Sequence, residues 1–409
     1  MQRFSPTIPW RLDPSVTFVN HGSFGACPLP VLAHQRSLID ELEAGPVAFL
    51  DTTIEDRIDQ ARHALARFLN ADPEGLVFVQ NATSGVSTVL RSRAVQPGDE
   101  LLTTDHEYNA TLNGLAELAR QHGARVVSTQ LPVEIESDDQ VVAAILGAVT
   151  ARTRLALVSH ITSPTGTVLP IERIVRELDA RGVDTLVDAA HAPGQVAVDV
   201  NGLGAAYWTG NGHKWLCGPK GSAALHVRAD RRDRIRPLVV SHGWNDGRSD
   251  RPRLWKEFDW TGTPDPTPAL ALPMAIAIVG GLHPGGWPGI MAANHELVIE
   301  GRGVIASALG VTLGVPSSMH GSMAIIPLPM PATDEAARAL KAALKAEDRI
   351  EVPITPFPVP AARRAASDPP DAVVVRISAQ LYNEPADYIH LAEALARRLG
   401  GSLGGSRVG

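Results

Sequence analysis

The chain has little of the chemistry that marks metal-binding, disulfide-bonded or nucleic-acid-binding proteins. Its only cysteines are Cys27 and Cys217, which lie far apart in the sequence and exclude both a disulfide framework and a cysteine metal site. There are 14 histidines, but their spacing offers no helical pair with a third ligand nearby, so we expect no metal. The net charge is −7 and no basic stripe occurs, so we expect no nucleic-acid partner.

Long apolar runs are also missing. No stretch approaches the roughly 18 apolar residues that a membrane helix needs, and no apolar signal core follows the N-terminus. We therefore expect a soluble, cytoplasmic protein without a membrane partner. Apolar residues make up 44% of the 409 positions, which is enough for a large core.

The middle of the chain alternates between apolar strands and helices. Strands are expected at 76–80, 100–104, 125–129, 154–160, 184–188, 205–209 and 222–227, and helices at 84–93, 109–122, 138–147 and 171–181. This alternation predicts an α/β fold with a mostly parallel seven-stranded sheet that is covered by helices on both faces. Ligands bind such sheets at the carboxyl ends of the strands.

The expected organisation runs from an N-terminal arm to a flexible tail. The arm covers residues 1–30, and a large domain covers 31–266, with helices at 32–42 and 53–69 and a charged loop at 228–266. Residues 267–399 form a linker helix (268–279) and a small α/β C-terminal domain. The expected elements of that domain are helices at 293–309, 333–346 and 386–398 and strands at 322–327, 350–354 and 371–378. Residues 400–409 are the tail.

Lys214 lies on a glycine-rich turn between two apolar strands. Burial there would lower the pKa of its amine, and a neutral amine can form a Schiff base. The alternative is a solvated surface lysine. Upstream, Asp188 ends an apolar strand, where a carboxylate faces the ligand crevice and could pair with the pyridine nitrogen of pyridoxal phosphate (PLP). A helix N-cap is the alternative for this residue.

Two further features suit the same cofactor. His191 follows Asp188 closely and could reach the PLP ring or its phenolic oxygen, although a polar residue at a strand edge is the alternative. The segment 81–84 opens a helix directly after a strand, and free N–H groups at a helix start bind phosphate. A simple N-cap is the alternative there. The order of phosphate turn, strand-end aspartate and lysine turn is what indicates PLP.

These motifs resemble the class V aminotransferase family of fold-type I PLP enzymes, and most of all its isopenicillin N epimerase-like branch. The resemblance runs from about residue 15 to about residue 398. It is carried by the segments 18–25 (FVNHGSFG), 105–109 (DHEYN), 159–166 (SHITSPTG), 187–194 (VDAAHAPG) and 212–216 (GHKWL). The branch also contains carbon–sulfur lyases that act on cysteine conjugates and sulfoxides, so the motifs specify the cofactor better than the reaction.

The resemblance implies a role for each matching position. Lys214 would carry the Schiff base, Asp188 would pair with the pyridine nitrogen, and His191 would lie near the phenolic oxygen. His106 would stack on the ring. Ser163 stands where related desulfurases place an asparagine on the phenolic oxygen. The phosphate contacts would come from Ala82, Thr83, Asn211, which replaces a serine common in the family, His213 and, across a homodimer interface, Thr263 of the second subunit.

The substrate contacts follow in the same way. Arg376 would hold the α-carboxylate of an amino-acid substrate, because its planar fork at the end of an apolar strand suits a carboxylate. A surface ion pair is the alternative. Asn20 and His21 of the N-terminal arm would lie near the substrate. Tyr108 is a candidate second acid–base group, with a half-buried structural tyrosine as the alternative.

The leading hypothesis is a carbon–sulfur β-lyase that acts on a cysteine S-conjugate or sulfoxide. An amino-acid epimerase and an aminotransferase are alternatives, because each begins with loss of the Cα proton. A catalytically silent binding protein with the same fold is the contrasting class. The joint presence of Lys214, Asp188 and Arg376 argues against a silent protein.

Overall fold

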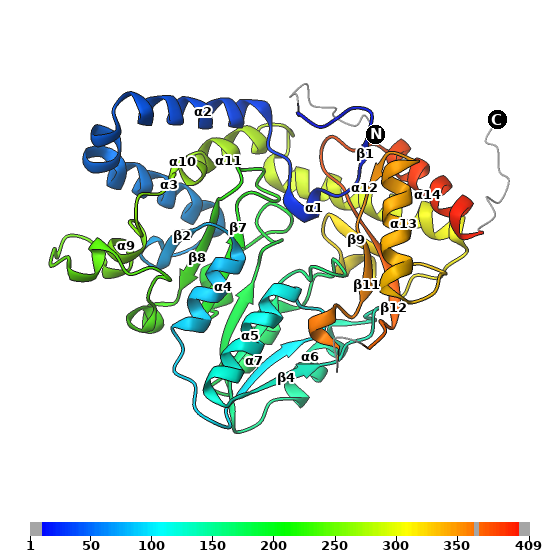
Figure 1. Cartoon of the computed structure of the whole chain (residues 1–409), viewed down its shortest axis with the longest axis horizontal. Helices are drawn as coiled ribbons and strands as arrows, with labels where there is room; N and C mark the ends of the chain where they lie inside the picture. Colours follow the sequence, from blue (N-terminus) through cyan, green and yellow to red (C-terminus); the bar gives the residue numbers. More distant parts are fainter. Residues whose placement is uncertain (1–9, 364–367, 401–409) are drawn as a thin grey trace.

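A seven-stranded sheet forms the centre of the molecule in the computed structural model, which describes residues 10–363 and 368–400 (Figure 1). Its strand order is β2–β8–β7–β6–β5–β3–β4. All neighbouring strands run parallel except β8, which is antiparallel to β2 and β7. The strands are β2 (Leu76–Val79), β3 (Glu100–Thr104), β4 (Arg125–Thr129), β5 (Thr153–Ser159), β6 (Asp184–Asp188), β7 (Tyr207–Asn211) and β8 (Ala223–Val227). The predicted α/β fold is confirmed.

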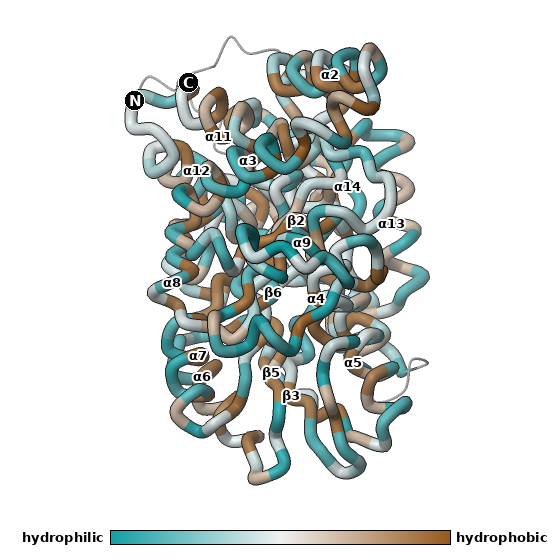
Figure 2. The backbone as a smooth tube through the Cα atoms, turned by 90° about the vertical axis from the view of Figure 1, so that its left-hand side faces the viewer, coloured by the Kyte–Doolittle hydropathy of each residue, from teal (hydrophilic) through white to brown (hydrophobic). Residues whose placement is uncertain are grey.

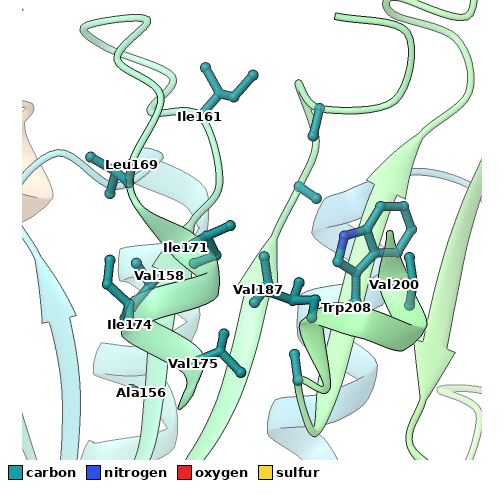
Figure 3. Close-up of a cluster of buried hydrophobic side chains, with 14 of the residues drawn as sticks. Ala156, Val158, Ile161, Leu169, Ile171, Ile174, Val175, Val187, Val200 and Trp208 are labelled. Atoms are coloured by element: carbon teal, nitrogen blue, oxygen red, sulfur yellow. The ribbon is translucent and has the colours of Figure 1, made fainter. Parts of the chain in front are cut away.

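Helices cover both faces of the sheet, and successive residues of a strand contribute their side chains to opposite faces. On β5, Ala156 and Val158 join a core with α6 (Asp138–Gly147) and α7 (Ile171–Asp179), while Leu155 and Leu157 join one with α4 (Ala82–Arg91) and α5 (Asn109–His122). Figure 3 shows the packing of α7 against the face of the sheet to which Ala156 and Val158 point. Figure 2 shows the apolar residues gathered along β3 and β5.

The N-terminal elements lie above one end of this sheet (Figure 1). They are β1 (Thr17–Phe18), α1 (His21–Phe24), α2 (Leu29–Ala44), a π-helix (Ala48–Thr53) and α3 (Ile54–Leu69). The predicted linker helix is divided into α10 (Thr267–Leu270) and α11 (Leu272–Gly280). Residues of α2, α3 and α10 share one apolar cluster, which includes Leu38, Ile58 and Leu270.

The C-terminal part has its own apolar core around a three-stranded antiparallel sheet of order β11–β12–β9. Its elements are α12 (Gly286–Leu309), β9 (Met323–Pro327), α13 (Asp334–Ala346), β11 (Ile354–Phe357), β12 (Ala372–Ser378) and α14 (Pro385–Leu399). The strand predicted at 350–354 was wrong in its extent, because the chain divides there into β10 (Ile350–Glu351), which pairs with β1, and β11.

The segment 228–266 was predicted to be a loop, but it contains a helix. This is α9 (Arg253–Phe258), which follows 3-10 turns at Ala229–Arg234 and His242–Asn245. Leu254, Trp255 and Phe258 of α9 are buried in the same core as α4 and α5. The flexible tail predicted at 400–409 lies outside the described residues except for Gly400. No helix in the described part of the chain is long and apolar enough to cross a membrane.

Candidate active site

The turn after β7 brings Lys214 to the carboxyl ends of the parallel strands. In the sheet register Ser159 of β5 lies opposite Asp188 of β6, which in turn lies opposite Thr209 of β7. The chain folds back after β7, and the N–H groups of Gly212 and His213 both donate to the Ser222 carbonyl at 2.9 and 3.2 Å. This backbone pairing holds the lysine turn.

Lys214, which is partly buried, forms a polar group with the buried side chains of His191 and Asp188. Its Nζ lies 3.0 Å from Nε2 of His191. The indole N–H of Trp215 donates to Nδ1 of the same ring at 3.4 Å, so a neutral His191 carries its proton on Nε2, toward the lysine amine. Burial lowers the pKa of Lys214 to about 7 and that of His191 well below its usual value.

Asp188 supplies the negative charge of this group. Its side chain is buried, and Oδ1 accepts the N–H of Ala190 at 2.9 Å. Burial raises the pKa of Asp188, while the Ala190 N–H and the positive charge of Lys214 oppose this shift. A carboxylate in this position can stabilise a second buried cation.

Arg376 of β12 approaches the same group from the C-terminal sheet. It is 6% exposed, and its guanidinium donates to the Ser163 carbonyl and, at 3.2 Å, to Oγ of Ser23. Both partners are neutral oxygens, so they leave the positive charge of Arg376 uncompensated. That charge helps to lower the pKa of Lys214 and of His191, which places the arginine within electrostatic reach of both. Burial lowers the pKa of Arg376 itself to about 10.

His21 lies behind the lysine instead of in the crevice. Its Nε2 is 3.0 Å from the Lys214 carbonyl, which can only accept, so Nε2 donates. Nδ1 then accepts the hydroxyl of Tyr382 at 2.9 Å, and the backbone N–H donates to Oγ of Ser378 at 2.7 Å. Burial lowers the pKa of His21 to about 3. These contacts use the polar atoms of His21 to hold the lysine backbone and Tyr382, and its role as a substrate contact stays a prediction.

The N-terminal arm fits closely against the lysine turn. Gly25 has φ +70°, and a Cβ at this position would overlap the His213 carbonyl and the Lys214 Cα. Asn20, the other predicted substrate contact of the arm, accepts the hydroxyl of Ser23 at 2.5 Å. Asn20 thereby reaches Arg376 through Ser23.

Of the predicted phosphate contacts, Ala82, Thr83 and Asn211 lie together at the start of α4. The N–H of Ala82 donates to Oδ1 of Asn211 at 2.9 Å, and Thr83 is exposed beside it. Nδ1 of His213 donates to the Ser222 carbonyl at 3.0 Å, and burial lowers the pKa of the ring to about 4. Its Nε2 therefore lacks a proton at neutral pH and gains one only beside an added negative charge. Thr263 is exposed on the loop between α9 and α10.

His106 and Tyr108 differ from their predicted placement. The His106 ring is fully buried; Nδ1 is 2.8 Å from Oγ1 of Thr165, Nε2 is 3.1 Å from the Pro132 carbonyl, and the ring contacts Phe357 at 4.5 Å between centroids. These contacts argue against ring stacking by His106. Tyr108 directly precedes α5, is 47% exposed, and lies close enough to Arg376 to influence its pKa.

Several residues at the site were missed by sequence reasoning. Tyr382 lies in no motif, and only the fold shows that it bonds His21. Ser23 and Trp215 lie in the segments 18–25 and 212–216, and the sequence placed Ser23 near the substrate, but their bonds to Arg376 and His191 follow from the fold. Glu107 stands inside the segment 105–109 that the sequence singled out, and an acid between two predicted site residues was an available signal.

The sheet order and the lysine turn are those of the fold-type I PLP enzymes. The cystine C–S lyase C-DES, solved with its product cysteine persulfide, superposes with a TM-score of 0.78 at 23% identity, covering 94% of this chain and 98% of that chain. The aminotransferase class-V family model matches residues 44–388, and the chain belongs to this family. The predicted resemblance is confirmed.

Relatives within the family have two different activities. The chain is 36% identical to isopenicillin N epimerase of Amycolatopsis lactamdurans, covering 94% of this chain and 95% of the relative. It is 30% identical to L-cysteine desulfhydrase of Arabidopsis thaliana, covering 93% of this chain and 87% of the relative.

Proposed function

We propose that the protein is a PLP-dependent enzyme that removes the Cα proton of an amino acid and breaks a carbon–sulfur bond at Cβ. Cysteine or a cysteine S-conjugate is the proposed substrate. The observation that carries the proposal is the buried Lys214–His191–Asp188 group with Arg376 beside it. The similarity to L-cysteine desulfhydrases along nearly the whole chain supports a sulfur-containing substrate.

The residues present fit PLP. An amine with a pKa of about 7 is available for a Schiff base, and Asp188 can balance a pyridinium. At the start of α4 the N–H groups of Ala82 and Ser84 are held by the side chains of Asn211 and Asn81, and a phosphate would bind there by replacing or joining these oxygens. The positive charge of Arg376 suits a carboxylate. In one solved structure of C-DES, glycine is linked covalently to the PLP of that enzyme. When bound, PLP supplies an electron sink for the negative charge that develops at Cα.

Each side chain then has a task at a stated atom. Arg376 binds the α-carboxylate and thereby fixes the direction of the Cα–H bond. Lys214 takes the Cα proton with its neutral amine, while His191 holds that amine through Nε2. Tyr108 can donate its phenolic proton to the departing sulfur. The Cα–H and Cβ–S bonds break, and the protonated sulfur leaves as hydrogen sulfide from cysteine or as a thiol from a cysteine S-conjugate. Hydrolysis of the remaining fragment yields pyruvate and ammonia.

Epimerisation is the second candidate, because the relatives include isopenicillin N epimerases at 36 and 33% identity. That reaction returns a proton to the opposite face of Cα, so it needs a donor other than Lys214. Tyr108 is available for this task as well, being partly exposed and near Arg376.

Incubation with a panel of amino acids and cysteine conjugates in deuterated water distinguishes these reactions. A lyase gives pyruvate and a thiol. An epimerase gives deuterium at Cα together with inverted configuration, and an aminotransferase gives a keto acid and pyridoxamine phosphate. Absence of pyruvate with every sulfur-containing substrate would contradict the lyase proposal.

The proposed active form is a homodimer in which Thr263 of one subunit contacts the phosphate bound by the other. Support comes from the exposure of Thr263, which lies in the segment 228–266. The same segment exposes three apolar side chains before α9, namely Val239 (53%), Val240 (61%) and Trp244 (60%). Exposed apolar residues grouped in one segment are typical of an interface.

A further inference from the structure

Glu107 is a buried carboxyl that none of the roles above uses. Its side chain is fully buried in the connection between β3 and α5. Oε1 accepts the N–H of Ser159 at 2.7 Å, and Oε2 accepts the Ser159 hydroxyl at 2.5 Å. Oγ1 of Thr104 lies 3.5 Å from Oε1. All these partners are neutral.

Ser159 connects this carboxyl to the lysine site. It lies directly opposite Asp188 in the register of β5 and β6. The negative charge of Asp188 is close enough to oppose ionisation of Glu107, and together with burial, the larger cause, it raises the pKa of Glu107 to about 8. Among the groups that face Glu107, namely Ser159 on β5, Asp188 on β6 and Thr104 on β3, Asp188 is the charged one.

Two buried carboxyls that share a site do not both ionise at neutral pH. Asp188 is the one with a cationic neighbour, Lys214, and an N–H donor from Ala190. Glu107 has neutral partners, and a hydroxyl such as that of Ser159 can also accept a proton from a carboxylic acid. The bonds donated by Ser159 and Thr104 lower the pKa of Glu107, but full burial and the charge of Asp188 outweigh them. Burial without a cationic neighbour therefore places the proton on Glu107 and the charge on Asp188, and a protonated Oε2 then donates to Oγ of Ser159 across the same 2.5 Å contact.

We propose that Glu107 is a positioning residue that fixes Ser159 beside Asp188 and, by staying protonated, leaves Asp188 as the one negative charge of the pair. The inference rests on the proposed function, because Asp188 needs its charge only if it faces a pyridinium. A second carboxylate here would repel Asp188, and loss of the side chain would leave the buried N–H of Ser159 without its acceptor.

The first test is infrared spectroscopy of the purified full-length protein at pH 7, which detects the stretch of a protonated carboxyl. The band should be present in the wild type and absent in Glu107→Gln. A band that survives unchanged in Glu107→Gln would assign the proton to another carboxyl and overturn the proposal.

The second test is the pH dependence of the melting temperature. The pKa of Glu107 is about 8 in the folded chain, against about 4.3 for a glutamate in the unfolded chain. The proton on Glu107 therefore stabilises the fold at low pH, and this contribution is lost as the pH rises through 8. Glu107→Gln has no proton to lose. Its melting temperature relative to the wild type should therefore rise steadily between about pH 5 and 9. A difference in melting temperature that stays the same at every pH would show that Glu107 acts only through its packing.

Asp105→Asn is the matched control, because Asp105 is a buried carboxyl of the same connection whose pKa is raised to about 6. Its difference from the wild type should stop changing above about pH 7. Neither measurement depends on turnover. A purified protein that takes up no PLP would contradict the proposed function while leaving both carboxyl results standing.

Discussion

At the scale of single residues, burial is the dominant influence on the candidate site. It lowers the pKa of Lys214, His191 and Arg376 and raises that of Asp188 and Glu107. In every case the shift favours the neutral form. The site therefore contains an amine that is reactive near neutral pH.

The lowered pKa of Lys214 predicts how PLP incorporation depends on pH. With a pKa of about 7, about half of the amine is neutral at pH 7, against on the order of 1 in 2,500 for an ordinary lysine. The rate of Schiff-base formation, followed by visible absorbance, should rise through about pH 7 and then level off. Lys214→Ala should lose borohydride-fixed cofactor. A rate that still rises at pH 9 would show that Lys214 keeps the pKa of an ordinary solvent-exposed lysine.

Arg376 allows a sharper test of substrate binding. Arg376→Lys keeps the charge but loses the two-pronged geometry, so kcat/KM for the amino-acid substrate should fall on the order of 100-fold, or about 2.7 kcal/mol. Turnover of the decarboxylated amine should change little. If Arg376→Ala weakens the two compounds equally, the arginine has a structural role and the carboxylate binds elsewhere.

The residue scale is also where sequence reasoning was least reliable. The strand ends placed Asp188 and Lys214 together, because a strand-end position fixes both location and direction. His21 and His106 lie in the right segments, yet their rings are fully buried and bonded to Lys214, Thr165 and Pro132. One sequence does not show which way a loop side chain turns, since the packing partners are distant in the chain.

At the scale of elements, the agreement is closer. The strands of the large sheet lie within two residues of their predicted bounds, because short apolar runs bounded by turn residues are local signals of a strand that is buried on both faces. Helix α9 was missed because its one face of Leu254, Trp255 and Phe258 is short and lies in a charged segment. The contact of α1 with the lysine turn is non-local: the family resemblance placed the arm near the active site, but the bond of His21 to the Lys214 carbonyl follows only from the fold.

The arm's contact with that turn predicts a cost for added volume at Gly25. Gly25→Ala should lower both the melting temperature and the affinity for PLP, because the new Cβ overlaps the backbone of His213 and Lys214. Gly98→Ala is the matched control, since Gly98 also has a positive φ, +85°, but nothing lies within 4 Å of its Cβ position. The control carries only the conformational cost, about 1–2 kcal/mol. Equal losses of melting temperature in the two variants would show that the arm moves to accommodate the added Cβ at no further cost.

At the scale of the whole molecule, assembly is the open prediction. If Val240 lies in the interface, Val240→Asp should yield monomers in sedimentation and weaken PLP binding, because subunit association and cofactor binding are linked. Ile389→Asp is the control: Ile389 is 47% exposed on α14, in the C-terminal part of the chain, and its change should leave a dimer. A fully active wild-type monomer would contradict the proposed shared site.

Strand β12 carries both the proposed carboxylate clamp and a residue that helps to hold the lysine turn. Arg376 and Ser378 lie on the same side of β12; the first is the proposed carboxylate clamp, and the second accepts the N–H of His21, whose ring holds the Lys214 carbonyl. For protein engineering this limits the choice of scaffold changes. An insertion or deletion in β12 made to accept a longer substrate would also release the lysine turn. New specificity is therefore better introduced from the segment around Ser163, which contacts the guanidinium and does not hold the lysine turn as His21 and Gly25 of the arm do.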